Sequence, residues 1–119
     1  MAESDGDSLG NNIADLNRVI HEPARLAILT VLASCEGADF TFLEAATGLT
    51  KGNLSVQLTR LDEAGLVDIE KTMKKNRTLT TVRMTREGHY QLGRYWRQME
   101  DIRNAAVQPA KGRWTDREA

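Results

Sequence analysis

The chain has a single cysteine, Cys35, so it cannot form a disulfide within itself. Its two histidines, His21 and His89, stand far apart, and no second cysteine lies near either of them. This leaves no cluster with the spacing of metal ligands. No apolar run approaches the roughly 20 residues that a membrane-spanning helix needs. We therefore expect a protein without a metal, a cofactor or a membrane anchor.

The beginning of the chain, MAESDGDSLG, also lacks the basic region and the apolar stretch of a secretory signal peptide. We therefore expect a cytoplasmic protein. Residues 1–11 are rich in Gly, Ser, Asp and Asn and predict a disordered acidic tail, and residues 107–119 predict a mobile one. Between them, residues 12–106 have the length and composition of one globular domain with its own core.

No enzyme site stands out, and we expect no enzymatic activity. Ser55 and Thr59 have no histidine nearby, and no pair of acids sits where a catalytic cleft is expected. Cys35 comes at the end of an apolar helical segment, where a buried structural thiol is the first interpretation. A redox-sensing or intersubunit thiol is the alternative, although the neighbouring Glu36 would disfavour the thiolate.

Acidic residues are also missing from one stretch of the chain, and this absence is informative. The formal net charge is only −1, yet residues 71–86 contain no Asp or Glu and six basic residues: Lys71, Lys74, Lys75, Arg77, Arg83 and Arg86. The first seventeen residues, in contrast, carry acids and no base. Such a separation of charge predicts that one surface of the folded protein binds a polyanion.

Apolar spacing predicts several helices. Ile13, Leu16, Val19 and Ile20 predict a short amphipathic helix over about 12–20. Pro23 suits the first turn of a second helix, which is apolar on most of its surface and ends near Gly37.

A helix-turn-helix is predicted next. Thr41 and Glu44 match a capping box for a short helix over about 42–47, which Gly48 ends. Thr50 is the expected N-cap of a helix over about 51–64, with Leu54, Leu58 and Leu61 on its buried face.

Two strands follow, over 66–71 and 79–84, joined by a basic hairpin tip at 72–78. Thr85 is expected to cap a last helix over about 86–106. The expected fold is mainly α with a small β-hairpin (α+β), a winged helix-turn-helix with extended N- and C-terminal helices.

This arrangement predicts a DNA-binding surface, with the 51–64 helix in the major groove and the hairpin tip on the backbone or in the minor groove. Asn53 has the chemistry to pair with adenine, while Lys51 and Arg60 suit guanine or phosphate. The residues expected to contact double-stranded DNA are Thr41, Thr50, Lys51, Gly52, Asn53, Ser55, Val56, Gln57, Thr59, Arg60, Lys74, Lys75 and Arg77.

The terminal helices predict a homodimer, because a small domain has little surface on which to bury their apolar stripes. The expected interface residues are Ile13, Leu16, Ile20, Leu92, Tyr95, Trp96, Met99 and Ile102. The alternative is that both helices pack only within one chain.

From about Ile20 to Leu92 the chain resembles winged-helix transcriptional regulators of the MarR/ArsR-like superfamily. The resemblance rests on Arg25-Leu26-Ala27-Ile28-Leu29, on Phe40 to Ser55, on Leu58 to Val67 and on Met84-Thr85-Arg86-Glu87-Gly88. It implies that Lys51, Gly52, Asn53, Ser55, Gln57 and Arg60 face DNA. The family often has His where Gln57 stands, and a glutamine cannot titrate. Metal-sensing relatives place a cysteine pair near the recognition helix, and this chain has none there.

The sequence thus predicts a homodimeric regulator on a pseudo-palindromic operator. The alternative is a winged-helix protein-interaction module within a larger assembly. The sequence leaves open the target genes, the sign of regulation and any small-molecule effector.

Overall fold

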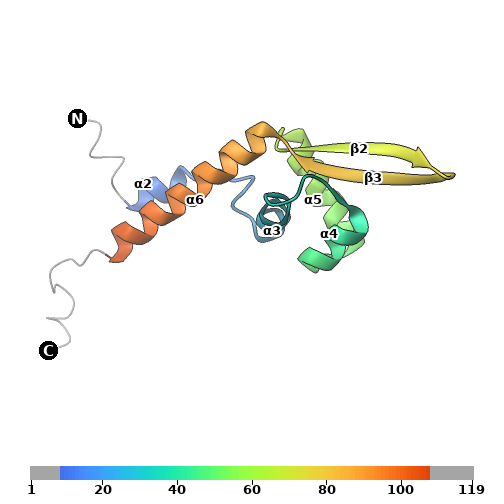
Figure 1. Cartoon of the computed structure of the whole chain (residues 1–119). Coiled ribbons are helices and arrows are strands. Elements are labelled where there is room, and N and C mark those ends of the chain that lie inside the picture. Colours follow the sequence, from blue (N-terminus) through green and yellow to red (C-terminus); the bar gives the residue numbers. More distant parts are fainter. Residues whose placement is uncertain (1–8, 108–119) are drawn as a thin grey trace, which may run out of the picture. The chain divides into compact units, whose positions relative to one another are not determined.

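The computed structural model describes residues 9–107, which form two compact units. Of the described residues, 9–16 and 95–107 belong to the first unit, and the second runs from Asn17 to Arg94. Helix α6, Arg86–Val107, contributes to both units. The second unit holds a helix-turn-helix and a three-stranded antiparallel sheet in the order β1-β3-β2, so the predicted winged-helix α+β fold is confirmed. Figure 1 shows the long hairpin of β2 and β3.

Three helices build most of the second unit, and each begins at a residue that caps it. α3 (Pro23–Leu32) has proline in its first turn, and the Glu22 carboxylate accepts a hydrogen bond from the Arg25 amide at 2.8 Å. α3 ends at Leu32, earlier than the expected end near Gly37, and residues 33–34 form a turn. α5 (Lys51–Glu63) begins as predicted, with the Thr50 hydroxyl accepting from the Asn53 amide at 3.1 Å.

The capping box expected at Thr41 is wrong. α4 (Phe40–Thr47) begins two residues earlier than predicted, and its N-cap is Asp39, whose carboxylate accepts from the Phe42 amide at 2.8 Å. Asp39 also closes a short strand, β1 (Ala38–Asp39), that pairs with β3 and that the sequence did not reveal. An acid at the end of a strand thus starts the helix and leaves the Thr41 side chain exposed.

The hairpin is longer than predicted, and its turn is shorter. β2 (Val67–Lys74) and β3 (Arg77–Met84) pair over their whole length, from Val67 opposite Met84 to Lys74 opposite Arg77. The expected seven-residue tip is therefore wrong, because only two residues connect the strands. Both have positive φ, 51° for Lys75 and 63° for Asn76. Positive φ at both central residues is the geometry of a type I′ turn, whose twist matches that of the paired strands.

The leucine stripe expected on α5 faces the core of the second unit. Leu54 and Leu61 are fully buried, and Leu58 is 1% exposed. They share this core with Ile20, Ile28, Leu29, Leu32, Leu43, Val67 and Val82, each at most 1% exposed. Because the leucines occupy one side of α5, the opposite side is left for other contacts.

The first unit contains α2 (Leu9–Ala14) and the C-terminal part of α6. Gln98 Nε2 donates to the Asp15 side chain at 3.2 Å, which joins these two segments. The helix expected over 12–20 is shifted, and residues 9–11 belong to it rather than to a disordered tail. It ends early because the Asn17 side chain accepts from the amides of Val19 and Ile20, at 2.9 and 3.2 Å.

Tyr95 is almost fully buried, and burial raises the pKa of its phenol. Its ring meets that of Trp96 edge to face at 5.3 Å, while Trp96 itself is half exposed. Residues 1–8 of the expected acidic tail and residues 108–119 of the expected mobile tail lie outside the described residues, while Val107 ends α6. Over residues 9–107, no helix is both long and apolar enough to cross a bilayer.

Candidate nucleic-acid interface

The outer face of α5 presents a row of small polar and cationic side chains. Of the residues expected to contact DNA from this helix, all but one are exposed: Lys51, Gly52, Asn53, Ser55, Val56, Thr59 and Arg60. Val56 is 54% exposed, and its apolar side chain suits contact with a thymine methyl group. The first turn, which usually meets base edges, begins with Lys51 and Gly52, and a Cβ at Gly52 would meet nothing within 4 Å.

Gln57 is the exception, because it is half-buried and held by the protein. Its Oε1 accepts from Arg25 Nη1 at 2.8 Å, and its Nε2 donates to Asn53 Oδ1 at 3.0 Å. Arg25 also donates through Nε to the Val19 carbonyl oxygen at 2.6 Å. The sequence marks Arg25 only as the start of a helix motif, and its hydrogen bond to Gln57 was not predicted.

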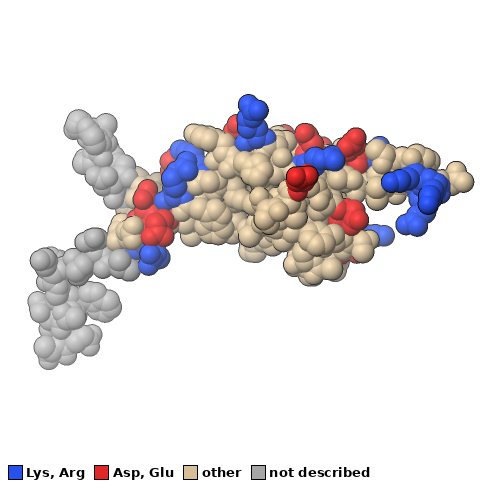
Figure 2. All heavy atoms as spheres, in the orientation of Figure 1, with Lys and Arg blue, Asp and Glu red and all other residues tan. Residues whose placement is uncertain are grey.

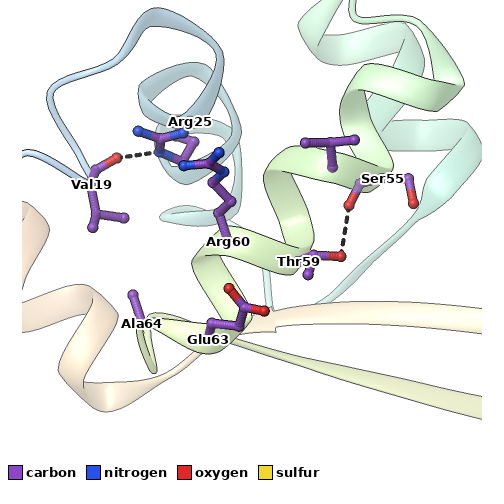
Figure 3. A pocket seen from close by; sticks show the side chains of 8 residues that line it. Val19, Arg25, Ser55, Thr59, Arg60, Glu63 and Ala64 are labelled. Carbon is purple, nitrogen blue, oxygen red and sulfur yellow. Dashed lines mark hydrogen bonds between the residues drawn. The ribbon is translucent and has the colours of Figure 1, made fainter.

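A hollow opens beside this network, between α5 and the turn that precedes α3 (Figure 3). Two guanidinium groups line it, those of Arg25 and Arg60, together with the hydroxyls of Ser55 and Thr59. Figure 3 shows Arg25 bonded to Val19 and Thr59 bonded back to the Ser55 carbonyl oxygen, at 3.1 Å in the latter case. Only Glu63 brings a negative charge to the lining. The hollow therefore extends the cationic face of α5 toward α3.

The end of the hairpin gathers positive charge, as Figure 2 shows by its cluster of Lys and Arg side chains. Lys74 stands directly opposite Arg77 in the ladder, and Lys75 occupies the turn between them. Like charges directly opposite one another destabilise a strand pair. The nearest acid along β2, Glu70, already pairs with Arg83 at 2.8 Å. A bound anion would relieve the repulsion at this end, which we call the wing tip.

A second cleft runs between α5 and the hairpin. Its walls carry Lys51, Ser55 and Thr59 from the helix and Lys71, Arg77 and Thr78 from the strands. Thr41 also reaches it from α4, while Asp39 and Asp62 add two acids. Lys71 was not among the residues expected to contact DNA. Its position in the stretch without acidic residues, 71–86, is the sequence feature that could have predicted this. Cations on both walls suit a phosphate backbone that passes between helix and wing.

The residues expected at a dimer interface divide by exposure. Ile13 and Trp96 are 49% and 46% exposed, and Met99 and Ile102 are half-buried. Leu16, Ile20, Leu92 and Tyr95 are already buried within one chain, between 0% and 6% exposed. These four have little area left to offer a second copy. The assignment of the whole set to an interface stays a prediction.

Comparison with known proteins identifies the family. The Winged helix DNA-binding domain family matches residues 24–102, so the chain belongs to it. The uncharacterized protein MJ0432 of Methanocaldococcus jannaschii is 31% identical over 78 residues, which cover 66% of this chain and 85% of that protein.

Two solved structures share the fold. A transcriptional regulator homologue from Pyrococcus horikoshii OT3 superposes with a TM-score of 0.73 at 24% identity, covering 83% of this chain and 96% of its own. A MarR-family transcriptional regulator from Silicibacter pomeroyi gives a TM-score of 0.59 at 19% identity, covering 92% of this chain and 73% of its own. The expected membership of a winged-helix family is thereby confirmed, and both structures share the fold of this chain.

Proposed function

We propose that the protein is a transcriptional regulator that binds a pseudo-palindromic operator as a homodimer, with α5 in the major groove of each half-site. The carrying observation is the exposed face of α5, where Lys51, Asn53 and Arg60 lie outward while the leucine stripe is buried. Side chains of these types match base edges and phosphates.

The wing tip supports the same proposal. Lys74, Lys75 and Arg77 are all exposed, and the two-residue turn holds them at the end of a regular ladder. Their repulsion is a cost in the free protein that a phosphate group would offset. We assign the wing to the DNA backbone. Contacts to the backbone fix the position of a protein on the duplex and do not depend on the base sequence.

The dimer is proposed from the first unit. Leu9 and Ile13 on α2 are 41% and 49% exposed, and Trp96 on α6 is 46% exposed. Three large apolar side chains exposed in so small a unit favour contact with a second copy. A two-fold axis would repeat α5 and present it to both half-sites of an operator.

The test is recovery of bound fragments from a library of genomic DNA by the purified chain, followed by gel shift on the recovered sequences. We expect an inverted repeat whose half-sites are about one helical turn apart, near 10 base pairs. Recovery of fragments with no common sequence, or of no DNA at low salt, would contradict the proposal. An interaction module in a larger assembly would then be the better interpretation.

A further inference from the structure

Three side chains form a continuous hydrogen-bonded line from α3 to the first turn of α5. Arg25 Nη1 donates to Gln57 Oε1 at 2.8 Å, and Gln57 Nε2 donates to Asn53 Oδ1 at 3.0 Å. The line is anchored at the backbone, because Arg25 Nε donates to the Val19 carbonyl oxygen at 2.6 Å. We call these three residues the Arg25 relay. It ends at Asn53, whose side chain is exposed on the proposed recognition surface.

The direction of the bonds in the relay follows from the chemistry of its first member. A guanidinium group has donors and no acceptor, so the Gln57 atom that faces Arg25 has to be the amide oxygen. The Gln57 nitrogen then faces Asn53, which has to present its own oxygen in return. The bond to Gln57 uses the Asn53 oxygen and leaves the Nδ2 group of the exposed Asn53 outside the relay, with two N–H donors.

We propose that the Arg25 relay makes Asn53 a reader of hydrogen-bond acceptors in the major groove, with Arg25 as its positioning residue. This inference rests on the DNA-binding function proposed above. Guanine presents two adjacent acceptors in the groove, O6 and N7, and Asn53 Nδ2 can donate to both when one of its N–H bonds points between them. The usual pairing of Asn with adenine needs the amide oxygen to accept from N6. In this protein that oxygen already accepts from Gln57, so pairing with adenine would have to use its one remaining lone pair, whereas both N–H donors of Nδ2 stand outside the relay.

Burial favours persistence of the relay in the free protein. Arg25 and Gln57 are half-buried, so water competes less for their hydrogen bond than it would at an exposed pair. A bond to a charged donor is also stronger than one between neutral groups. The second bond, from Gln57 to Asn53, is exposed to water, so the firmly held Gln57 biases the orientation of Asn53 rather than locking it. Arg25 thus acts on sequence preference without needing to touch a base.

The experiment is selection of bound sequences from a randomised duplex library by the full chain and by variants. Asn53→Ala identifies the operator position that Asn53 reads, because preference disappears there. At that position we expect the unaltered protein to favour guanine over adenine by roughly ten-fold, the size of one good two-bond contact. Arg25→Met releases Gln57, and we expect the guanine preference to fall to within about two-fold.

Gln57→Glu tests the direction of the bonds. A carboxylate has only acceptors, so it keeps the bond to Arg25 but has to accept from Asn53 Nδ2 as well. The Asn53 oxygen then turns outward, and preference should move to bases that offer a donor, cytosine at N4 or adenine at N6. This variant retains Arg25 and so remains informative if Arg25→Met fails to fold.

Arg103→Met is the control for loss of one positive charge, since Arg103 is exposed on α6 and pairs with Glu100 at 2.8 Å. It should keep the guanine preference. If Arg25→Met and Gln57→Glu bind with the preference of the unaltered protein, whatever their affinity, Arg25 is merely structural and the relay is overturned. The proposed function would survive that result, whereas failure of the unaltered protein to bind any duplex would overturn both.

Discussion

Gly88, in the first turn of α6, lies against the backbone carbonyl of Leu66 at the start of the hairpin. A Cβ at position 88 would overlap the Leu66 carbonyl oxygen and approach Met84 Cγ to 2.7 Å. The same oxygen accepts from the Thr85 amide at 3.0 Å. The Thr85 hydroxyl accepts from the Gly88 amide at 2.9 Å and donates to the Gly65 carbonyl oxygen at 2.7 Å. Because glycine has no side chain, α6 can pack at residue 88 against the Leu66 backbone at the start of the hairpin.

We expect Gly88→Ala to lower the free energy of unfolding by about 1–3 kcal/mol, the usual cost of overpacking a close contact. The intrinsic preference of alanine for helices would offset about 1 kcal/mol at most. The measurement is urea denaturation followed by circular dichroism. Gly52→Ala is the matched control, because a Cβ there meets nothing within 4 Å. If both variants are equally stable, the Gly88 contact is unimportant.

The turn of the wing gives a second prediction, at Asn76. Its φ is 63°, a conformation that asparagine tolerates and β-branched residues avoid. We expect Asn76→Val to destabilise the hairpin locally by about 1–2 kcal/mol, seen as faster hydrogen exchange in β2 and β3. Asn76→Gly keeps the turn and should leave exchange unchanged or slower. Equal exchange in the two variants would contradict the turn geometry.

These two positions show what the sequence could predict and what it could not. The Met84 to Gly88 motif and the Thr50 cap were local signals, and the elements they predict are present. The wing turn was missed because Lys75-Asn76 lacks the glycine that marks a two-residue hairpin. The strand at Ala38–Asp39 is too short for any alternation to show, and it exists through its pairing with β3.

The candidate site, like the fold, could be predicted from the sequence only in part. Exposure of the α5 face follows from the leucine spacing alone, and the structure agrees except at the half-buried Gln57. The bond between Arg25 and Gln57 joins residues 32 positions apart, and no periodicity within one helix reveals such a contact. The sequence could not predict which of the expected interface residues are buried within one chain, because an apolar stripe does not show which surface covers it. The buried ones are Leu16, Ile20, Leu92 and Tyr95.

The recognition face gives a third prediction. We expect Arg60→Ala to weaken operator binding by about 1–3 kcal/mol if its guanidinium makes a two-bond base contact. Asn53→Ala should weaken it within the same range, about 1–3 kcal/mol. Both side chains are exposed, so thermal unfolding should barely change. Fluorescence anisotropy with labelled operator measures the affinity. Unchanged affinity in both variants would remove this face of α5 from the interface.

The proposed dimer gives a fourth prediction, through Trp96 and Met99 on α6. Trp96→Glu combined with Met99→Glu places two charges where an apolar contact is expected, and we expect a monomer in sedimentation at micromolar concentration. The affinity of this double variant for the operator should also fall, because each half-site supplies only part of the contacts. Asn104→Glu, an exposed change on the same helix, is the control. An unaltered chain that sediments as a folded monomer would refute the dimer.

The wing tip gives the last prediction, which separates backbone contact from base reading. Replacing Lys74, Lys75 and Arg77 together by alanine removes the cations at the end of the hairpin but leaves Val67 and Val82 in the core. If the wing holds phosphates, affinity for operator and for random DNA should fall by similar factors. The slope of log affinity against log salt should also decrease, by roughly 0.9 for each phosphate that the wing no longer neutralises.

In a dimer both wings contribute, so the change in slope should be about twice that of one subunit. The measurement is a salt titration of the unaltered chain and the triple variant on both DNAs. Removal of the repulsion between Lys74 and Arg77 should meanwhile leave the free hairpin as stable as before or more so, which hydrogen exchange can verify. A variant with weaker affinity for operator alone, and with its salt slope intact, would show that the wing reads bases or groove shape. The assignment of the wing tip to the phosphate backbone would then be wrong.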